Sequence, residues 1–501
     1  MDNQKMIQKV SQGITPNKIS NVCGEINKIT MEAWAKNDCD TLARMLLAGK
    51  NKLQLAPNSE LKPSLIDEAH YCIQALEAVA MNGDILFIRD PEKGFVSKLS
   101  DVKRVIYNHY AQAKKPIDYK KVEEIYRQMS VAAPAKQETK GNFIQFKNGI
   151  LDLNTMTLKA NDPDRFFACT VPHNYNPSTE PVELVDKIFN AWACDDPLKI
   201  DLMFAWIGYN MINAVPLHTF MVIYGPKRNG KSAFCKVITL VLGDNNTSSL
   251  PVSDLNKQFK TAALVGKLAN LSTENEGGAL PELITLKALT SGDKIPMERK
   301  GEDVVDYVFT TKLTFCFNQP FSTEDSSGAT KARMLVLRFN ADFMDPKDQD
   351  PYLIDKLQDE KAMEYIIARS VKAIKEVLDR GYFIMPEDSK EFVQEQEYRD
   401  NPIRAFYYFI ESGNEVFLDS DMDLPIMTDK KFWYKYHSDQ IYSAYKYWFV
   451  ECSEMKGKPE SKNKFCGQLK EDKNLVSYRD TDKKTNKKVT YYRQKKLSLE
   501  E

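Results

Sequence analysis

The spacing of apolar residues predicts that the middle of the chain alternates between buried strands and helices. Four short, largely apolar runs between residues 219 and 340 have the length of strands: TFMVIY, KLANLS, KLTFCF and MLVLRF. Helical patterns lie between them, and strands that alternate with helices in this way form parallel sheets. A further helical pattern at residues 352–383 is expected to pack on that sheet.

The regions on either side of this segment have different patterns. Residues 65–140 combine helical patterns with a short strand pair at 85–99, and FIQFKNGILDLNTMTLKANDP carries Asn-Gly and Asn-Thr turn signals between two or three short strands. Near the end, two helical patterns precede a strand, a turn and a second strand at residues 475–493. An acidic linker at residues 412–425 is expected to separate this last unit from the rest.

The domain organisation follows from these patterns. A chain of 501 residues is too long for one ordinary hydrophobic core. We therefore expect a multidomain α/β protein with four parts: a helical segment at residues 1–65, an α+β domain at 66–182, an α/β domain at 183–385 and a C-terminal domain at 386–501.

The amino-acid composition limits the kinds of partner that we expect for this protein. The 69 Lys and Arg residues balance 70 Asp and Glu residues, so any nucleic-acid surface has to be a local patch. The most apolar window, residues 203–225, contains Asn210, Asn213 and Pro216, which favours a buried helix and strand over a membrane span. No signal-peptide pattern is present, so a cytoplasmic protein without a membrane partner is expected. Nine scattered cysteines without a C-x-x-C pair predict reduced thiols rather than a zinc site.

The segment GPKRNGKS joins the first strand of the sheet to a helical pattern and fits G-x-x-x-x-G-K-[ST] at every fixed position. In such a loop, backbone N–H groups and the start of a helix face phosphates, and glycines let the backbone approach them. Lys231 is expected to reach the β- and γ-phosphates, and Ser232 to bind Mg²⁺. The sequence therefore predicts ATP and Mg²⁺ as cofactors, held by Gly225, Pro226, Lys227, Arg228, Asn229, Gly230, Lys231 and Ser232.

Hydrolysis of a nucleotide also needs a carboxylate near the metal and the attacking water. The run KLANLS is followed by Glu274 and Glu276, at a spacing expected after a P-loop. Glu274 is the first choice for polarising the water or binding the metal, and Glu276 is the second. Glutamates after a strand are commonly solvated, and only their position after a P-loop favours the catalytic interpretation.

Further polar residues follow along the chain. The run KLTFCFN ends at Asn318, whose amide is expected to orient the γ-phosphate and its water. Arg333 precedes the last strand of the sheet, where it would stabilise charge on a neighbouring subunit's ATP if the protein forms a ring. Between these strands, a polar turn carries Lys294, Arg299 and Lys300 away from the core.

In this order, GPKRNGKS, GKLANLSTENE, LKALTSGDKIPMERK, KLTFCFN and ATKARMLVLRF resemble the motifs of superfamily 3 helicases of the poxvirus and phage or plasmid primase-helicase type. In that family they are Walker A, a Walker B variant, a DNA-contacting hairpin, a sensor Asn and an arginine finger. The resemblance implies an AAA+-like parallel sheet with helices on both faces. It also implies a helicase-associated α+β domain before the sheet and a small winged-helix domain after it.

The resemblance further implies a replicative DNA helicase of a phage, plasmid or other mobile element, assembled as a hexamer with ATP between subunits. Lys294, Arg299 and Lys300 would then contact one DNA strand, although solvated loop charges remain the alternative. Lys487 and Lys488, in the C-terminal strand-turn-strand, either touch a DNA backbone or form a basic tail.

The sequence departs from the family pattern at two positions. Asn270 stands in the Walker B strand where an aliphatic residue is usual, and Ala332 occupies the place of an arginine that often precedes Arg333. Residues 1–65 are too few for a primase domain, so a separate primase is a candidate partner. The alternative functions are an ATP-switched origin-binding initiator or loader and, more remotely, an ATPase acting on protein or a packaging motor.

Overall fold

The computed structural model describes most of the chain after residue 63. The described residues are 64–81, 85–90, 94–162, 164–275, 277–280, 284–300, 303–319, 321–323, 329–345, 347, 349–414, 431–453, 458–482 and 486–495. The helical segment expected at residues 1–65 lies almost entirely outside them, and so does Glu276.

The central element is a five-stranded sheet in which all neighbouring strands run parallel. Its order is β16-β8-β14-β10-β9, with bounds Met334–Arg338, Phe220–Tyr224, Lys312–Phe317, Ala269–Asn275 and Thr247–Ser248. β8 and β14 are almost entirely buried, as expected for the centre of a parallel sheet. The predicted parallel sheet is confirmed: four strands lie at the predicted positions, and β9 adds a short edge strand.

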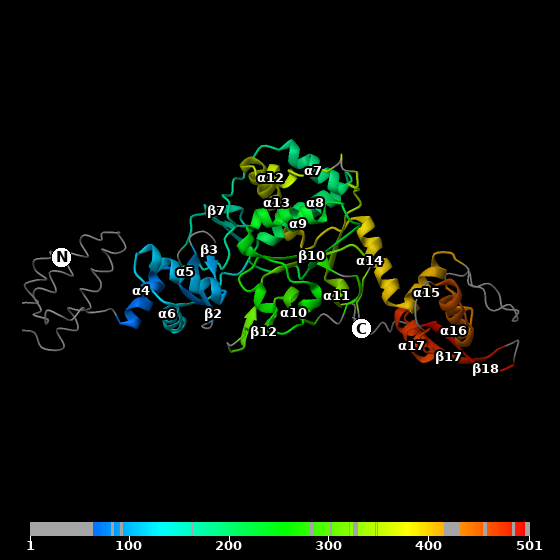
Figure 1. Ribbon diagram of the computed structural model, residues 1–501. Coiled ribbons are helices and arrows are strands. Elements are labelled where there is room, and N and C mark those ends of the chain that lie inside the picture. Colours follow the sequence, from blue (N-terminus) through cyan, green and yellow to red (C-terminus); the bar gives the residue numbers. More distant parts are fainter. Residues whose placement is uncertain are drawn as a thin grey trace, which may run out of the picture. The chain divides into compact units, whose positions relative to one another are not determined.

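Helices connect and cover these strands. They are α7 (Glu183–Ala193), α8 (Pro197–Met211), α9 (Lys231–Leu242), α10 (Ile284–Ser291), α11 (Ala329–Ala332), α12 (Leu353–Leu357) and α13 (Glu360–Arg380). In Figure 1, α7, α8, α12 and α13 gather at the top of the central unit, and α10 and α11 lie at its bottom. The helical pattern at residues 352–383 is divided in two because Asp359 caps α13, accepting from the backbone N–H groups of Lys361 and Ala362.

The region before the sheet contains two smaller sheets, one with the order β3-β2-β1-β4 and one with the order β5-β6-β7. The elements are α4 (Leu65–Ala75), β1 (Val79–Met81), β2 (Ile85–Asp90), β3 (Gly94–Val96), α5 (Leu99–Gln112), α6 (Tyr119–Ala132), β4 (Ala135–Lys136), β5 (Phe143–Phe146), β6 (Gly149–Asp152) and β7 (Thr157–Lys159). The expected strand pair β2–β3 and the strands around the Asn-Gly turn are present. The short strands β1 and β4 had no clear sequence signal.

Among the residues that the structure describes, buried apolar side chains form two large, separate cores. The first extends along the sequence from Val79 to Phe392 of α14 (Glu387–Asp400), and the second begins at Ile403 of α15 (Pro402–Glu411). Asn401 and Pro402 start the new helix, since the Asn401 side chain accepts from two backbone N–H groups and proline suits the first helical turn. The change of core thus falls between Phe392 and Ile403, later than the expected boundary at residue 386, because α14 still packs on the first core. The helix α15 joins the second core before the acidic linker begins.

The second core is completed by α16 (Ser438–Tyr447), α17 (Lys462–Asp472), β17 (Leu475–Thr481) and β18 (Lys488–Gln494). Trp433, Tyr445 and Trp448 are buried in it, so large aromatic side chains supply much of this core. Within the described parts of the chain, no helix is long and apolar enough to cross a membrane.

Candidate functional site

The segment GPKRNGKS connects β8 to α9. Neighbouring protein atoms leave no room for a side chain at its two glycines. Gly230 has a φ of +96°, and a Cβ there would lie 2.5 Å from Cδ1 of Trp192 on α7. A Cβ on Gly225 would overlap the carbonyl oxygen of Phe339. Any side chain at either position would therefore displace the loop or its support.

The chain that follows β16 holds this loop in place. Nδ2 of the buried Asn229 donates to the Phe339 carbonyl at 2.7 Å, and the Phe343 N–H donates to the Arg228 carbonyl at 3.0 Å. On the other side, the Gly225 N–H donates to the carbonyl of Phe317 on β14 at 3.2 Å. The loop is thus held by the chain at the ends of two neighbouring strands, and no pattern along the sequence predicts these contacts.

Lys231 is the first residue of α9, and its buried side chain turns back toward the loop. Its Nζ donates to the carbonyls of Gly225 and Pro226, at 2.7 and 2.5 Å, and to Oδ1 of Asn229 at 3.0 Å. Burial lowers the pKa of Lys231, because all three acceptors are neutral. An ammonium group held by neutral oxygens fits the approach of a phosphate, which would supply the missing negative charge.

Two thiols lie near the first turn of α9. Sγ of Cys235 and Sγ of Cys316 on β14 are 3.5 Å apart, and both residues are buried. The hydrogen bond with Cys316 and burial raise the pKa of Cys235 well above its ordinary value. The Cys235 thiol therefore stays neutral at physiological pH.

The register of the sheet brings the candidate hydrolytic residues to one edge. One residue from each of four strands stands in a single row: Asn275, Phe317, Tyr224 and Arg338. Glu274, Asn318 and the loop that begins at Gly225 all adjoin this row, at the carboxyl ends of β10, β14 and β8. Strands lie about 4.8 Å apart, so Tyr224 and Asn275 are separated by about 10 Å.

A bulge in β10 sets the position of Glu274. Ser272 pairs with Phe315, but the next pair joins Asn275 to Phe317, so β10 contains one extra residue. Nδ2 of Asn275 donates to the Cys316 carbonyl at 3.2 Å, and its Oδ1 accepts from the Val252 N–H at 3.1 Å.

These contacts anchor the bulge and leave Glu274 exposed at the end of the strand. Sequence reasoning did not single out Asn275, whose role depends on the register shift. Glu276 lies outside the described residues.

Asn270 is unusual for a Walker B strand, but its side-chain amide forms hydrogen bonds within the core. Its Oδ1 accepts from the Leu250 N–H at 2.7 Å and from Oγ of Ser248 at 2.9 Å, and its Nδ2 donates to the Leu250 carbonyl at 2.9 Å. The amide thus fastens the chain after β9 to β10, and the strand keeps its place between β9 and β14.

Few side-chain oxygens among the predicted site residues are placed to bind Mg²⁺. Ser232 is exposed on the first turn of α9 and Glu274 is exposed at the bulge. In the described part of the chain, no three His, Cys, Asp or Glu side chains are grouped as a metal site. This arrangement fits Mg²⁺, which commonly takes one or two protein oxygens together with phosphate and water.

Arg333 lies at the opposite edge of the sheet from the loop. Its carbonyl accepts from the N–H of Phe220, the first residue of β8, whereas the loop follows the last residue. Five residues of strand separate these ends by about 17 Å. Its guanidinium donates to the Ala329 carbonyl at 3.0 Å and to Oγ of Ser291 at 3.2 Å. Arg333 is therefore not part of its own chain's phosphate site.

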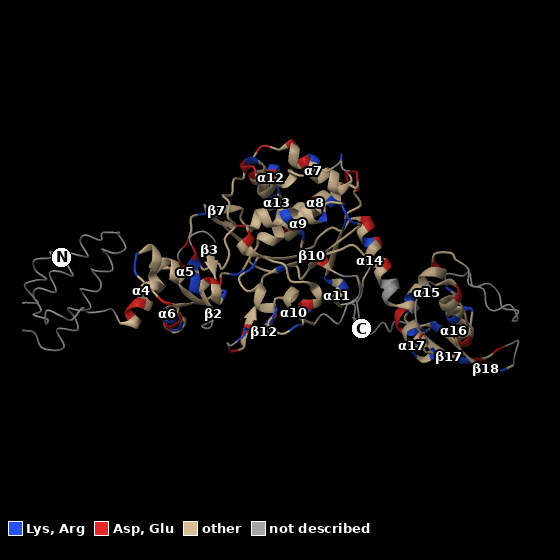
Figure 2. Ribbon diagram, viewed as in Figure 1, with Lys and Arg blue, Asp and Glu red and all other residues tan. Residues whose placement is uncertain are grey.

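The polar turn after α10 is a hairpin of β12 (Lys294–Met297) and β13 (Val305–Val308). Lys294 pairs with Val308 at its base, and Arg299 and Lys300 lie in the loop at its tip. Figure 2 shows that acidic residues share this hairpin with the basic ones. The structure places the three candidate DNA contacts on one hairpin but at different distances from its end.

The C-terminal hairpin has one buried and one accessible face. Tyr478 and Tyr491 stack with ring centroids 5.9 Å apart, and the guanidinium of Arg493 lies 5.7 Å from the Tyr478 ring. Tyr492, by contrast, is 3% exposed and belongs to the second core. Lys487 and Lys488 are exposed beside the turn.

Two families match parts of this chain. Residues 69–196 match the family described as "D5 N terminal like", and residues 223–333 match one described as "Family of unknown function (DUF5906)". The second match extends from β8 to Arg333 and so includes the loop, β10 and the β12–β13 hairpin.

Two solved structures are similar in fold. "The apo structure of NrS-1 C terminal region (305-718)" is 10% identical, with a TM-score of 0.50 and coverage of 86% of this chain and 99% of that chain. "The A form apo structure of NrS-1 C terminal region-CTR" is 10% identical, with a TM-score of 0.48 and coverage of 86% and 98%. The D5-like match, together with the motifs along the sheet, confirms the resemblance to superfamily 3 helicases drawn from the sequence.

Proposed function

We propose that this protein is an ATP-dependent replicative DNA helicase of a phage, plasmid or other mobile element. The observation that carries the proposal is the shared edge of the sheet, where the loop around Lys231, Glu274 and Asn318 adjoins one row of paired residues. A phosphate-binding loop, a carboxylate and an amide at this spacing are the groups that nucleotide hydrolysis requires.

Each of these residues has a distinct role in the proposal. Lys231 moves its ammonium from the loop carbonyls to the β- and γ-phosphates of ATP. Ser232 and Glu274 hold Mg²⁺, which neutralises charge on the phosphates. Glu274 also polarises the attacking water, with Glu276 as the second candidate, and Asn318 orients that water. The backbone from Gly225 to Gly230 binds the phosphates through its N–H groups.

The position of Arg333 supports a ring in which subunits share their ATP sites. Arg333 lies about 17 Å from the loop of its own chain, so it would complete the site of a neighbour. Such an arginine typically accelerates hydrolysis by about 10³-fold or more. In a hexamer, the β12–β13 hairpin would face the central channel, where Arg299, Lys300 and Lys294 would contact the DNA backbone.

A second candidate function is an ATP-switched initiator or loader that binds origin DNA without processive unwinding. The exposed Lys487 and Lys488 beside the C-terminal turn favour it, because a basic hairpin suits contact with duplex DNA. The same surface could recruit a separate primase.

The test is strand displacement on a forked DNA with a 3′ tail in the presence of Mg-ATP. Wild type is compared with Lys231→Ala, Arg333→Ala and the control Lys236→Ala, which removes an exposed lysine from the same helix as Lys231. ATP hydrolysis and particle mass by light scattering are measured in parallel.

We expect a ring-sized particle that loses both activities in Lys231→Ala and Arg333→Ala and keeps them in Lys236→Ala. Mixing the two inactive variants should restore some hydrolysis, because a mixed interface can combine an intact loop with an intact arginine. ATP hydrolysis without displacement in wild type would favour the initiator or loader. An Arg333→Ala variant with full hydrolysis would contradict the shared site.

A further inference from the structure

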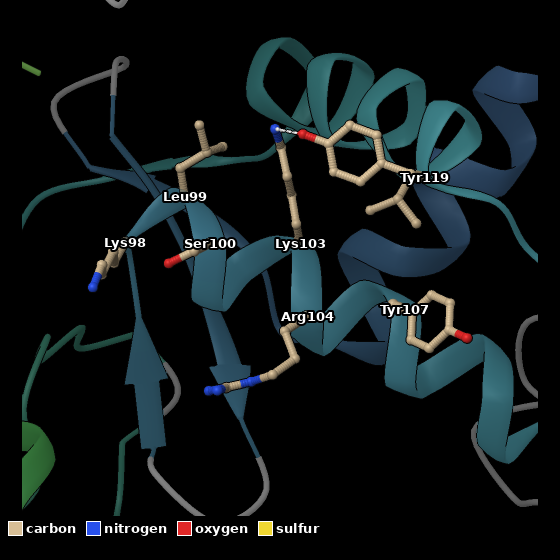
Figure 3. A pocket seen from close by; sticks show the side chains of 8 residues that line it. Lys98, Leu99, Ser100, Lys103, Arg104, Tyr107 and Tyr119 are labelled. Carbon is tan, nitrogen blue, oxygen red and sulfur yellow. Dashed lines mark hydrogen bonds between the residues drawn. The ribbon is translucent and has the colours of Figure 1, made fainter. Parts of the chain in front are cut away.

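A second region with phosphate-binding chemistry lies before the sheet, on α5 and α6. A cavity of about 700 Å³ opens there, and Figure 3 shows its side chains. It is lined by Lys98, Leu99, Ser100, Lys103, Arg104, Tyr107, Tyr119 and Val122. The lining combines cationic groups with aromatic rings and contributes nothing to the ATP site described above.

The helix α5 presents two different faces. Val102, Val105, Ile106 and Tyr110 are buried, whereas Ser100, Arg104 and Tyr107 line the cavity at spacings of four and three residues. Tyr107 is 50% exposed, so core packing does not explain why this position carries a large aromatic side chain.

Tyr119, at the start of α6, is 70% exposed and is held by a neighbouring lysine. Nζ of Lys103 donates to the Tyr119 hydroxyl at 3.2 Å and lies 5.3 Å from the centre of its ring. Lys103 also forms an ion pair with Glu123, so its own charge is largely compensated. These contacts hold the Tyr119 ring beside the cavity (Figure 3).

Arg104 and Lys98 supply the accessible positive charge. One nitrogen of Arg104 pairs with Asp101 at 2.8 Å, and about half of the Arg104 side chain is exposed. A guanidinium has five N–H donors, so one carboxylate oxygen leaves several of them for another ligand. Lys98 is exposed directly before α5.

We propose that this cavity binds single-stranded nucleic acid. Lys98 and Arg104 contact its phosphates, and Tyr107 and Tyr119 stack against its bases. Exposed aromatic rings beside basic side chains are the combination that single-strand binding uses, since bases in a duplex are already stacked on each other. An acidic peptide would use the cations but not the accessible faces of both rings. Binding at this cavity needs no ATP hydrolysis, so it can be tested independently of the proposed helicase activity.

The first test locates the bound strand. The full chain is mixed with oligothymidylate that contains 5-iodouracil, without nucleotide, irradiated and digested, and the linked peptides are identified by mass spectrometry. We expect adducts on Tyr107 or Tyr119. Adducts confined to other parts of the chain, such as the β12–β13 hairpin or the C-terminal hairpin, would overturn the proposal.

The second test measures affinity by fluorescence anisotropy with the same oligothymidylate. Tyr107→Ala and Tyr119→Ala should each weaken binding roughly 5- to 100-fold, the range found when a stacking aromatic is removed. The matched control is Tyr382→Ala, because Tyr382 is 59% exposed and has the guanidinium of Arg380 5.3 Å from its ring. Wild-type affinity in both cavity variants would refute stacking.

Two competitors separate the alternatives in the same assay. A duplex of equal length should compete poorly for the labelled strand, and polyglutamate should compete only at low salt. Equal competition by duplex would contradict recognition of single strands. Equal competition by polyglutamate at physiological salt would identify the cavity as a site for acidic protein segments instead.

Discussion

The P-loop and the α5–α6 cavity offer positive charge to phosphates in opposite ways. In the P-loop, Lys231 is buried, and Asn229 ties the backbone to the Phe339 carbonyl. In the cavity, Arg104 and Tyr107 extend from one helix into solvent, and Arg104 is held by an ion pair with Asp101 of the same helix rather than by a neighbouring strand. A group that takes part in a reaction must be fixed to within a fraction of an ångström, whereas a site that only holds a flexible strand can keep flexible side chains.

This difference also explains why one site has a sequence motif and the other has none. Backbone donors have to adopt a particular loop conformation, and that conformation requires glycine at fixed positions. Exposed side chains on a helix can hold a strand from many positions. The comparison predicts that small changes in the P-loop have large effects and that changes in the cavity have graded ones.

The largest effect is expected for Gly230→Ala. The added Cβ would lie 2.5 Å from Trp192, so the loop has to move, and a displacement of about 1 Å can lower a rate about 100-fold. We expect kcat/KM for ATP hydrolysis to fall by at least this factor.

The control is Gly381→Ala, since Gly381 also has a positive φ, +86°, but has nothing within 4 Å of a Cβ. It should cost about 1–2 kcal/mol of stability and leave hydrolysis unchanged. Equal losses in both variants would mean that backbone strain alone is responsible.

A smaller, more selective effect is expected for Asn275→Ala. The substitution removes the hydrogen bonds to Val252 and Cys316 that anchor the β10 bulge, but it leaves the P-loop intact. We expect kcat for ATP hydrolysis to fall about 10-fold with little change in KM, because Glu274 loses its position. Asn270→Ala, on the same strand, should lower the free energy of unfolding by about 1–3 kcal/mol without this kinetic signature. A rise in KM alone for Asn275→Ala would contradict the positioning role.

In the cavity, a single cation should have a graded effect on DNA binding. Arg104→Ala should reduce the slope of log affinity against log salt for oligothymidylate by about 0.7–1, as expected when one phosphate contact is lost. Lys231→Ala, measured without ATP, should leave that slope at the wild-type value, because Lys231 is enclosed by its own loop. A change in the slope for Lys231→Ala, with none for Arg104→Ala, would place the DNA contact at the P-loop and not at the cavity.

The smallest effect concerns a second buried lysine, at the start of β14. Lys312 is 1% exposed and donates to the carbonyls of Ile212 and Thr310, and burial lowers its pKa to about 7. The unfolded chain keeps the ordinary value of 10.5, so it binds more protons than the folded chain between about pH 7 and 10.5. The free energy of unfolding should therefore rise with pH in this window, by at most about 1.4 kcal/mol per pH unit.

Lys312→Met should flatten that rise, and urea unfolding at several pH values between 7 and 10 measures it. Lys236→Met, which changes an exposed lysine, is the control. Glu138 and Cys169, the titratable groups that act on Lys312, are present in both variants. An unchanged slope in Lys312→Met would show that the lysine stays charged inside the fold.

Sequence by itself determined the elements whose signals are local. Each buried strand is a short apolar run, and the P-loop motif lies between one such run and a helical pattern, so four strands and the loop could be predicted. A polar turn with Lys294, Arg299 and Lys300 was likewise predicted between its neighbours, and the family resemblance alone implied that it forms a hairpin. These features depend on residues that are adjacent or nearly adjacent in the chain.

Only the tertiary structure decided which residues support the site. Asn229 and Phe339 are 110 positions apart, and the row from Asn275 to Arg338 exists only because four separate strands pair in one register. The burial of Tyr492 and the meeting of α5 with α6 around the cavity are of the same kind. Such contacts form when distant segments pack together, and a pattern along the chain does not contain the distances between segments.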